Sequence, residues 1–394
     1  MHRKIRHILF LIFVSIFVIG APVIVLYTAG YRLNPTTWKV QHTGVIAITT
    51  IPGNATVSVN GTLVSDRTPF VDQRLMPGEY DVLLSRNGYQ PWQQRVTVES
   101  GQTTYITALL FRDTVPELLL EEQAISVTGS MDGRFVYLLV HEAEETPSQV
   151  WRYDTVTRLQ RKLADVSLDI TSITLNNNQN SILLSVDDDV TSAIDVNTGT
   201  TLTSDDLANV TNLLPEFTFV DNGANVEMRT SATNTLVTLL PLSTYTTILR
   251  QQNIAILKDS RDRAYLVDLT TSSVTQIDIP TALITASSNE NILAASDGNE
   301  VVVYTPHNGE KTLLTRQSEP LVALAWHPSD RAILLATSSR IFAIERDRYE
   351  TRETTTLLSD ATIVNIWTDT SGRNLTFFGA VNGIQGIWRL PMGQ

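Results

Sequence analysis

The sequence predicts an all-β protein that follows one N-terminal transmembrane helix. Three observations support this fold class. An uncharged apolar run of about 20 residues lies near the N-terminus. A stretch of about 70 residues then alternates apolar and polar side chains between Asn-Gly pairs. The rest of the 394-residue chain carries a weak repeat of about 40 residues. Pro and Gly interrupt these later regions too often for long helices.

The apolar run predicts a helix that crosses a membrane. A short basic head precedes it, made of His2, Arg3, Lys4, Arg6 and His7. The run from Ile8 to Tyr27 carries no charge, and Ser15 is its only clearly polar residue. At about 1.5 Å per residue it spans roughly 30 Å, the thickness of the hydrocarbon core of a bilayer. Lipid offers the backbone no hydrogen-bond partners, so the segment is expected to be helical.

A cleavable signal peptide is the alternative interpretation of this run. Its best small-residue site, Gly20-Ala21, is followed by Pro22, which is a poor place for cleavage. We therefore expect a retained anchor in the plasma membrane. The basic head predicts a cytoplasmic N-terminus and places everything after Tyr31 outside, although Arg32 and Lys39 reduce that charge bias.

Composition limits the partners and cofactors of the chain. The formal net charge is -12 and the pI is about 5.0. A nucleic-acid partner is therefore not expected, because phosphate binding needs clustered Lys and Arg. The sequence contains no cysteine, which excludes disulfides, thiolate metal sites and lipid attachment through Cys. No cofactor is predicted.

Residues 43–111 predict a compact antiparallel β-sandwich of about six strands. Thr56 to Val59 alternates cleanly and ends in Asn60-Gly61, the strongest short signal for a hairpin. Further alternating segments are Val45 to Ile48, Tyr80 to Leu84, Arg95 to Val98 and Thr104 to Ile106.

This region resembles the PEGA domain family. The matching blocks, in order, are Ile51 to Val57, Val59-Asn60-Gly61, Thr68-Pro69-Phe70, Pro77-Gly78-Glu79-Tyr80 and Asn87-Gly88-Tyr89. The block Pro77-Gly78-Glu79-Tyr80 departs from the Pro-Glu-Gly-Ala tetrapeptide that names the family. The resemblance implies an envelope-associated β-sandwich without catalytic residues, in which the prolines and glycines serve turns.

Residues 115–394 predict a β-propeller of seven blades, with six or eight left open because the unit near residues 210–245 is degenerate. Each unit reads as a hydrophobic strand, a polar turn, two more strands and a polar fourth strand. The texture resembles WD-repeat or TolB-like propellers, but the Trp-Asp repeat endings are missing. The predicted domains are a head and helix at 1–31, a linker at 32–42, the sandwich at 43–111 and the propeller at 115–394.

The final unit lacks one strand, because only three are visible before Gln394. An open sheet edge would leave backbone groups unpaired. We therefore expect the unassigned apolar segment near residues 117–122 to form the outermost strand of the last blade. This places the domain boundary near Arg112 to Pro116.

No catalytic, cofactor-binding or metal-binding residue is predicted. Ser130 to Gly133 partly resembles the Asp-box of sialidase propellers, but a plain β-turn is favoured. Asp187-Asp188-Asp189 lacks the spacing and the glycine of a calcium loop, and Asp205-Asp206 is a weaker candidate still. His327, in Trp326-His327-Pro328, is expected to be structural.

The function predicted from these features is binding or scaffolding in the cell envelope through a face of the propeller. The partner would be an unidentified envelope protein or polysaccharide. One rival is a propeller enzyme acting on envelope polysaccharide. Acidic and aromatic side chains at the central channel would favour that enzyme, whereas a channel lined by Thr and Val would favour the binder. A sensor subunit of a membrane complex is a third possibility, for which Ser15 and Gly20 give little support.

Overall fold

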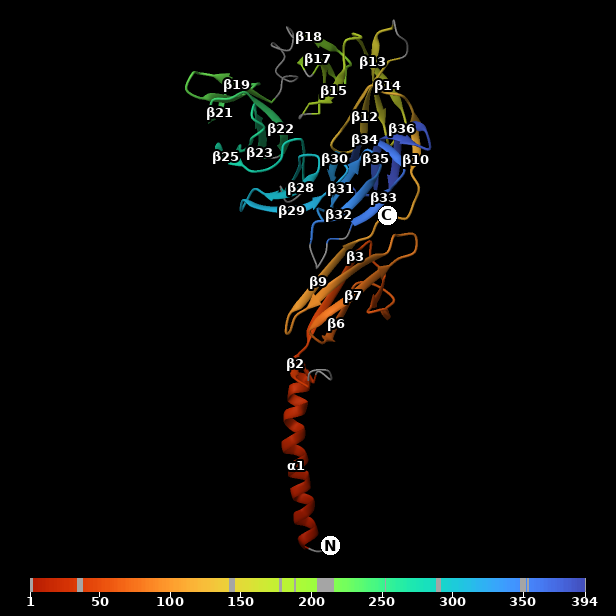
Figure 1. The fold of residues 1–394 in the computed structure, drawn as a ribbon, viewed down its shortest axis with the longest axis vertical. Coiled ribbons are helices and arrows are strands. Elements are labelled where there is room, and N and C mark those ends of the chain that lie inside the picture. The colour runs from red at the N-terminus through yellow and green to blue at the C-terminus, as the bar shows by residue number, and fades with distance from the viewer. Residues whose placement is uncertain are drawn as a thin grey trace. The chain divides into compact units, whose positions relative to one another are not determined.

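The computed structural model describes residues 3–33, 38–141, 146–176, 179–187, 189–203, 216–251, 253–287, 292–347, 352 and 354–393 (Figure 1). Residues 1–111 form one compact unit, and residues 112–346 and 354–394 belong to a second. We describe the two units separately.

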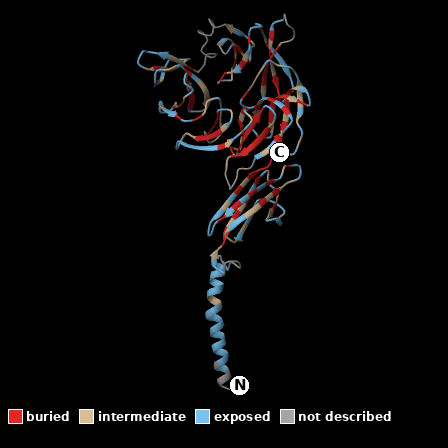
Figure 2. Ribbon diagram, in the orientation of Figure 1, coloured by how far each residue is buried: buried red, intermediate tan, exposed pale blue. Residues whose placement is uncertain are grey.

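The first unit begins with α1 (Arg3–Thr28), which continues through Pro22. Its segment Ile8–Thr28 is the one helix among the described residues that is long and apolar enough to cross a membrane. The apolar side chains of this segment are exposed rather than packed against protein (Figure 2). A 26-residue helix of this composition would be unstable in water with its apolar faces exposed, so it requires an apolar environment.

A short hairpin follows the helix within the predicted linker. It pairs β1 (Tyr31–Leu33) with β2 (Val40–His42) in antiparallel register. The residues between the two strands, 34–37, lie outside the described part of the chain.

The β-sandwich has seven strands in two sheets. One sheet has the order β6-β3-β9, with β3 (Gly44–Ile51), β6 (Phe70–Leu75) and β9 (Thr103–Leu109). The other has the order β5-β4-β7-β8, with β4 (Thr56–Val59), β5 (Thr62–Ser65), β7 (Gly78–Ser85) and β8 (Trp92–Val98). Their facing sides form one core that includes Ile46, Val57, Leu84, Trp92 and Ile106.

The predicted Asn60-Gly61 turn is confirmed, because both residues have positive φ and join β4 directly to β5. The expectation of a purely antiparallel sandwich is wrong in one place. β3 pairs with β9 in parallel, from Val45 opposite Thr103 to Ile51 opposite Leu109. The first and last strands of the domain therefore run in the same direction, and the five strands between them supply the crossover that a parallel pair needs.

The second unit contains seven antiparallel sheets among the described residues, numbered sheet 1 to sheet 7 here. Sheet 1 comprises β11 (Ser126–Gly129), β12 (Phe135–Val140), β13 (Ser148–Asp154) and β14 (Gln160–Val166). Sheet 2 comprises β15 (Ser172–Leu175), β16 (Ser181–Val186), β17 (Asp189–Asp195) and β18 (Thr201–Thr203). Sheet 3 comprises β19 (Phe217–Asp221), β20 (Val226–Thr230) and β21 (Leu236–Leu240).

The remaining sheets each have four strands. Sheet 4 comprises β22 (Tyr245–Gln251), β23 (Ile254–Asp259), β24 (Ala264–Asp268) and β25 (Ser273–Ile277). Sheet 5 comprises β26 (Leu283–Ala286), β27 (Leu293–Ser296), β28 (Glu300–Thr305) and β29 (Glu310–Arg316). Sheet 6 comprises β30 (Leu321–Trp326), β31 (Ala332–Thr337), β32 (Ile341–Glu345) and β33 (Thr354–Leu358). Sheet 7 comprises β34 (Ala361–Thr368), β35 (Asn374–Val381), β36 (Ile384–Pro391) and β10 (Glu117–Glu121).

Among the described residues, six of the seven pairs of neighbouring sheets pack side by side, an arrangement consistent with a propeller (Figure 1). Buried apolar clusters join sheet 1 to sheet 2, sheet 3 to sheet 4, sheet 4 to sheet 5, sheet 5 to sheet 6, and sheet 7 back to sheet 1. β30 of sheet 6 lies against β34 of sheet 7. Sheets 2 and 3 are separated in sequence by residues 204–215, outside the described residues. The blade number therefore stays a prediction, although the described sheets match the seven expected units.

Burial within each sheet follows the predicted pattern. The second and third strands are the most buried; every residue of β31 and β32, for example, is buried. Fourth strands such as β29 are mainly exposed, and their sequence is polar. The hydrophobic second and third strands therefore fill the space between neighbouring sheets, and the polar fourth strand meets solvent.

The predicted closing strand is confirmed. β10 pairs antiparallel with β36, with Glu117 opposite Arg389 and Glu121 opposite Gly386. A Cβ on Gly386 would lie 2.1 Å from the carbonyl oxygen of Leu120, so only glycine allows this approach. Sheet 7 thus obtains its fourth strand from a segment more than 200 residues earlier in the chain.

Candidate binding site at the centre of the propeller

The first strands of five sheets line a cavity of about 390 Å³. Each contributes residues at its C-terminal end, just before the turn to the second strand. The described lining residues are Gly129, Met131, Ile248, Leu249, Arg250, Gln251, Ile284, Thr285, Ala286, Leu324, Ala325, Trp326, Ile366, Trp367 and Thr368. The repeat itself therefore builds the site, because the same position recurs in each sheet.

The lining is mainly apolar. It also contains the hydroxyl groups of two threonines and the indole rings of two tryptophans. Arg250 carries the only charge among the described lining residues, and its Nε donates to Glu216 Oε1 at 2.9 Å. Both side chains are largely buried, so the pair is locally neutral. A cavity of this composition favours apolar or uncharged polar groups over ions.

Trp367 marks the meeting of the first and last sheets at this cavity. A Cβ on Gly129 would lie 2.5 Å from the indole ring of Trp367. Gly129 on β11 therefore leaves the space that lets Trp367, from β34, lie across the first strand of sheet 1. The amino acid at position 129 controls the position of an aromatic wall of the cavity.

Many acidic side chains of the propeller accept hydrogen bonds from backbone N–H groups in its turns. Asp195 Oδ1 accepts the backbone N–H groups of Asn197 and Thr198, each at 2.8 Å. Asp154, Asp268 and Asp297 likewise accept the N–H groups of the residues two and three positions on. Asp259 and Asp369 accept N–H groups that lie up to four and five positions on in their turns. The N–H of Thr198 holds the pKa of Asp195 below its usual value, and that of Glu300 does the same for the pKa of Asp297.

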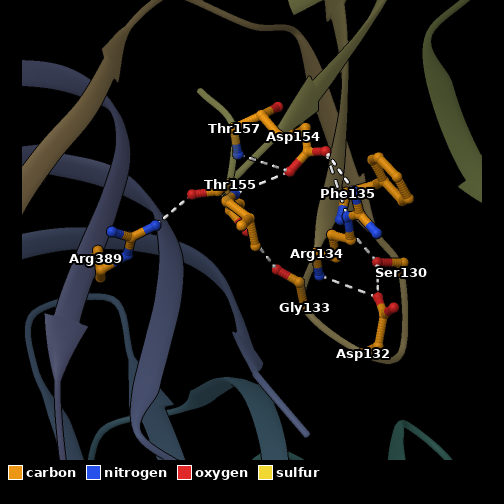
Figure 3. A network of polar contacts seen from close by, with 10 residues as sticks. Ser130, Asp132, Gly133, Arg134, Phe135, Asp154, Thr155, Thr157 and Arg389 are labelled. Carbon is orange, nitrogen blue, oxygen red and sulfur yellow. Dashed lines mark hydrogen bonds and ion pairs between the residues drawn. The ribbon is translucent and has the colours of Figure 1, made fainter. Parts of the chain in front are cut away.

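Asp154 shows how such a turn also joins sheets (Figure 3). Its carboxylate accepts from the guanidinium of Arg134 at 3.1 Å and from the N–H of Val156 and Thr157. Burial alone would raise the pKa of Asp154, but these donors hold it below the usual value. The carbonyl of the next residue, Thr155, accepts a hydrogen bond from Arg389 on β36. The network therefore connects sheet 1 to sheet 7.

Comparison with protein families identifies the first unit. A model of the PEGA domain matches residues 43–112. The chain carries a PEGA domain. The match covers the seven-stranded sandwich and extends one residue beyond the expected end at 111.

Two further comparisons concern the whole chain. No curated protein matches it in sequence. A chain of the crystal structure of a mitotic checkpoint complex is similar with a TM-score of 0.46 and 10% identity, over 70% of this chain and 89% of that chain. The propeller is therefore assigned here from its own strand pairing rather than from this likeness.

The Asp-box-like segment beyond the PEGA domain forms a turn. The N–H of Gly133 donates to the carbonyl of Ser130 at 2.9 Å, and the Ser130 hydroxyl accepts from the N–H of Phe135 at 2.9 Å. Asp132 accepts from the N–H of Arg134 in the same turn (Figure 3). These bonds within and beside the turn agree with the plain β-turn favoured by the sequence.

His327 joins sheets 6 and 7 and lies buried. Its Nδ1 contacts Ser329, and its Nε2 lies 3.2 Å from the carbonyl oxygen of Gly372. A Cβ on Gly372 would lie 2.6 Å from the ring. Burial lowers the pKa of His327, which keeps the imidazole neutral near pH 7. These contacts give His327 the structural role that the sequence suggested.

Only some residues of the acidic clusters considered for metal binding lie in the described part of the chain. Asp187 is an exposed turn residue with φ of 48°, whereas Asp188, Asp205 and Asp206 lie outside the described residues. Among the described residues there is no group of three or more His, Asp or Glu side chains able to hold a metal ion.

The sequence did not predict the residues that line the cavity. Glu216 and Arg250 are 34 residues apart, and no local pattern joins them. A usable signal does exist for the lining. Gly129, Ala286, Trp326 and Thr368 each directly precede the polar residue that opens the first turn of their unit. Aligning the units on that polar residue would have placed these four positions in one ring.

Proposed function

We propose that this chain is a membrane-anchored binding or scaffolding protein of the cell envelope, and that the propeller face carrying the central cavity binds its partner. α1 would hold the chain in the plasma membrane, with the PEGA domain and propeller on the extracytoplasmic side. The partner would be an envelope protein or a polysaccharide, and no catalysis is proposed.

The composition of the cavity carries this proposal. Five strands bring mainly apolar side chains, two threonines and two tryptophans to one place, and the described lining residues include no Asp or Glu. Aromatic and hydroxyl groups suit both a sugar ring and a protein side chain. An enzyme acting on glycosidic bonds would instead need a pair of carboxyl groups at this place. Trp326 and Trp367 fit either role, so the carboxyl groups are the distinguishing feature.

The membrane part of the proposal rests on α1 and on the PEGA domain, whose resemblance implies an envelope location. The basic residues before the apolar run support a cytoplasmic N-terminus. Protease added to intact spheroplasts should then remove both β-units and leave the head. Complete protection of the chain would contradict this orientation.

Affinity capture of the anchored protein from its native envelope, followed by mass spectrometry and glycan analysis, tests the binding role. Thr285→Arg places a long cation in the cavity and should abolish recovery of the partner. Thr275→Arg is the matched control, because Thr275 lies on the exposed fourth strand of the neighbouring sheet. Equal recovery with both variants would exclude the cavity face. Turnover of envelope glycans by the purified exterior region, lost on mutating one carboxylate pair, would replace binding with catalysis.

A further inference from the structure

The hairpin formed by β1 and β2 starts and ends at the C-terminus of α1. After Thr28, Gly30 accepts two hydrogen bonds through its carbonyl oxygen, from the backbone N–H of Thr43 at 2.8 Å and from the Thr43 hydroxyl at 3.0 Å. Thr43 in turn accepts the N–H of Gly101, which lies between β8 and β9 of the PEGA domain. β1 therefore leaves the end of the helix, and β2 returns to it.

The two faces of this hairpin differ in character. In the register of the pair, Tyr31 lies opposite His42, and Leu33 lies opposite Val40, so these four share one face. The rings of Tyr31 and His42 meet edge to face at 5.0 Å between centroids. Leu33 and Val40 are more than half exposed. Trp38, two residues before Val40, is 78% exposed, an unusual state for the largest apolar side chain.

Arg32, on the opposite face, turns back onto the helix. Its guanidinium donates to the carbonyl oxygen of Tyr27 at 2.7 Å and lies 3.5 Å from the centroid of the Tyr27 ring. The last carbonyls of a helix have no partner within the helix, and a cation there is favourable to its dipole. Arg32 therefore caps α1 and fixes the hairpin against the helix end, leaving the apolar face outward.

Chain geometry limits how far this face can lie from the membrane, given the anchor in the proposed function. A bilayer's interfacial layer is about 5–7 Å thick on each side, from the difference between the total and the hydrocarbon thickness. Three residues beyond Thr28 reach at most about 11 Å. The start of the hairpin therefore lies within the interfacial layer or at most a few ångströms beyond it, next to the depth where Trp and Tyr gather in membrane proteins.

We propose that the exposed face of Tyr31, Leu33 and Val40, together with the exposed Trp38 just before β2, inserts into the headgroup region of the membrane that α1 spans. The occupant of this face is the lipid interface itself. Continuity with the apolar surface of α1 favours lipid over a separate protein partner, and exposed Lys39 is placed for contact with lipid phosphates. This inference rests on the proposed membrane anchor but adds a second point of attachment, which would hold the PEGA domain at a fixed height.

The test uses the full chain in phosphatidylcholine vesicles, with and without bromine on the acyl chains near the interface. Bromine quenches indole fluorescence only at contact distance. Trp38 should be quenched by brominated lipid and emit at shorter wavelength, and Trp38→Phe should lose that quenching. Leu33→Glu with Val40→Glu keeps the indole but should withdraw it, so its quenching should fall to the level of Trp38→Phe.

A matched control places a tryptophan at Ile51 in the Trp38→Phe chain. Ile51 is 42% exposed and ends β3, an extended strand whose first residue, Gly44, follows the hairpin, so the two ends of β3 lie far apart. This tryptophan should not be quenched. Vesicle flotation separates the two proposals. A chain that floats with vesicles but shows equal quenching with and without Trp38 refutes the interfacial hairpin alone. A chain that does not float refutes the anchor and the hairpin together.

Discussion

Within the described residues, sheets 7 and 3 of the propeller differ in the strands that they contain. Each takes three strands from its own part of the sequence. Sheet 7 receives β10 as a fourth strand, whereas sheet 3 has three strands within the described residues. Sheet 3 is joined to sheet 4 by side chains, through the Glu216–Arg250 pair and a shared apolar cluster. Sheet 7 thus gains a strand from a distant part of the chain, whereas the described link between sheet 3 and sheet 4 is made by side chains.

Removing β10 should have the largest effect on this comparison. Deleting Leu118 to Glu121 takes away a strand and three half-buried leucines, which we expect to cost about 4 kcal/mol of unfolding free energy. Urea unfolding measures this loss. The control deletion of Ala224 and Asn225 leaves Asn222-Gly223 as a two-residue turn between β19 and β20 and should cost about 1 kcal/mol. Equal costs for the two deletions would show that closure by β10 contributes little to stability.

Adding one methyl group at Gly386 tests the contact between β10 and β36 alone. Gly386→Ala forces a Cβ against the Leu120 carbonyl oxygen and should cost about 2–3 kcal/mol, the range of an overpacked site. In sheet 3, Gly223→Ala meets no atom within 4 Å, and only its φ of 86° opposes the change, at about 1 kcal/mol. Thermal unfolding of both variants measures the difference. A smaller effect at Gly386 than at Gly223 would contradict the close approach of β10.

The ion pair of sheet 3 should contribute less than the strand of sheet 7. Glu216→Gln removes the charge of one partner of the partly buried Glu216–Arg250 pair and should cost about 1–2 kcal/mol, between the values for exposed and buried pairs. Lys311→Ala, in a pair whose Asp278 is 99% exposed, is the control and should change stability by less than about 0.5 kcal/mol. Chemical denaturation compares them. If both substitutions are equally mild, side-chain charge does not secure sheet 3.

The smallest expected effect is a pH dependence of the stability, which arises at His327 between sheets 6 and 7. Burial lowers the pKa of His327 below 6.5, while the Gly372 carbonyl, Asp369 and Asp330 oppose this shift in part. Below pH 6.5 the unfolded chain binds a proton at this histidine that the folded chain does not, so stability should fall as the pH drops. Above pH 6.5 this contribution is constant.

His327→Asn removes the titrating group and should flatten the melting temperature between about pH 7 and about pH 5. The turn aspartates do not interfere in this window. Their folded pKa values lie below the ordinary 3.8, so the stability they contribute is lost only at more acidic pH. An unchanged slope in His327→Asn would assign the pH dependence to another group.

The sequence was sufficient wherever the deciding signal was local or could be counted. Asn60-Gly61 predicts its turn because two consecutive residues with positive φ are needed there. The closing strand could be predicted because the last unit is one strand short and one apolar segment had no assignment.

Features that depend on distant convergence were out of reach. No local pattern tells β9 to pair with β3 in parallel rather than with a sequence neighbour. Glu216 and Arg250 meet only because two neighbouring sheets pack. The sequence does not predict the pairing of β1 with β2 inside the linker, since three-residue strands have too few alternating positions to be recognised.

The position of β10 has a mechanical consequence. Under the proposed function, a pull between the membrane and a partner on the propeller would enter this unit along residues 112–117. There the N–H of Arg112 donates to Met392, the Thr114 hydroxyl donates to Pro391, and β10 then pairs with β36. The tether is thus attached to the final strand of the ring as well as to the first sheet. The paired strands β10 and β36 would then share the load, so that the force would not separate one sheet from its neighbours.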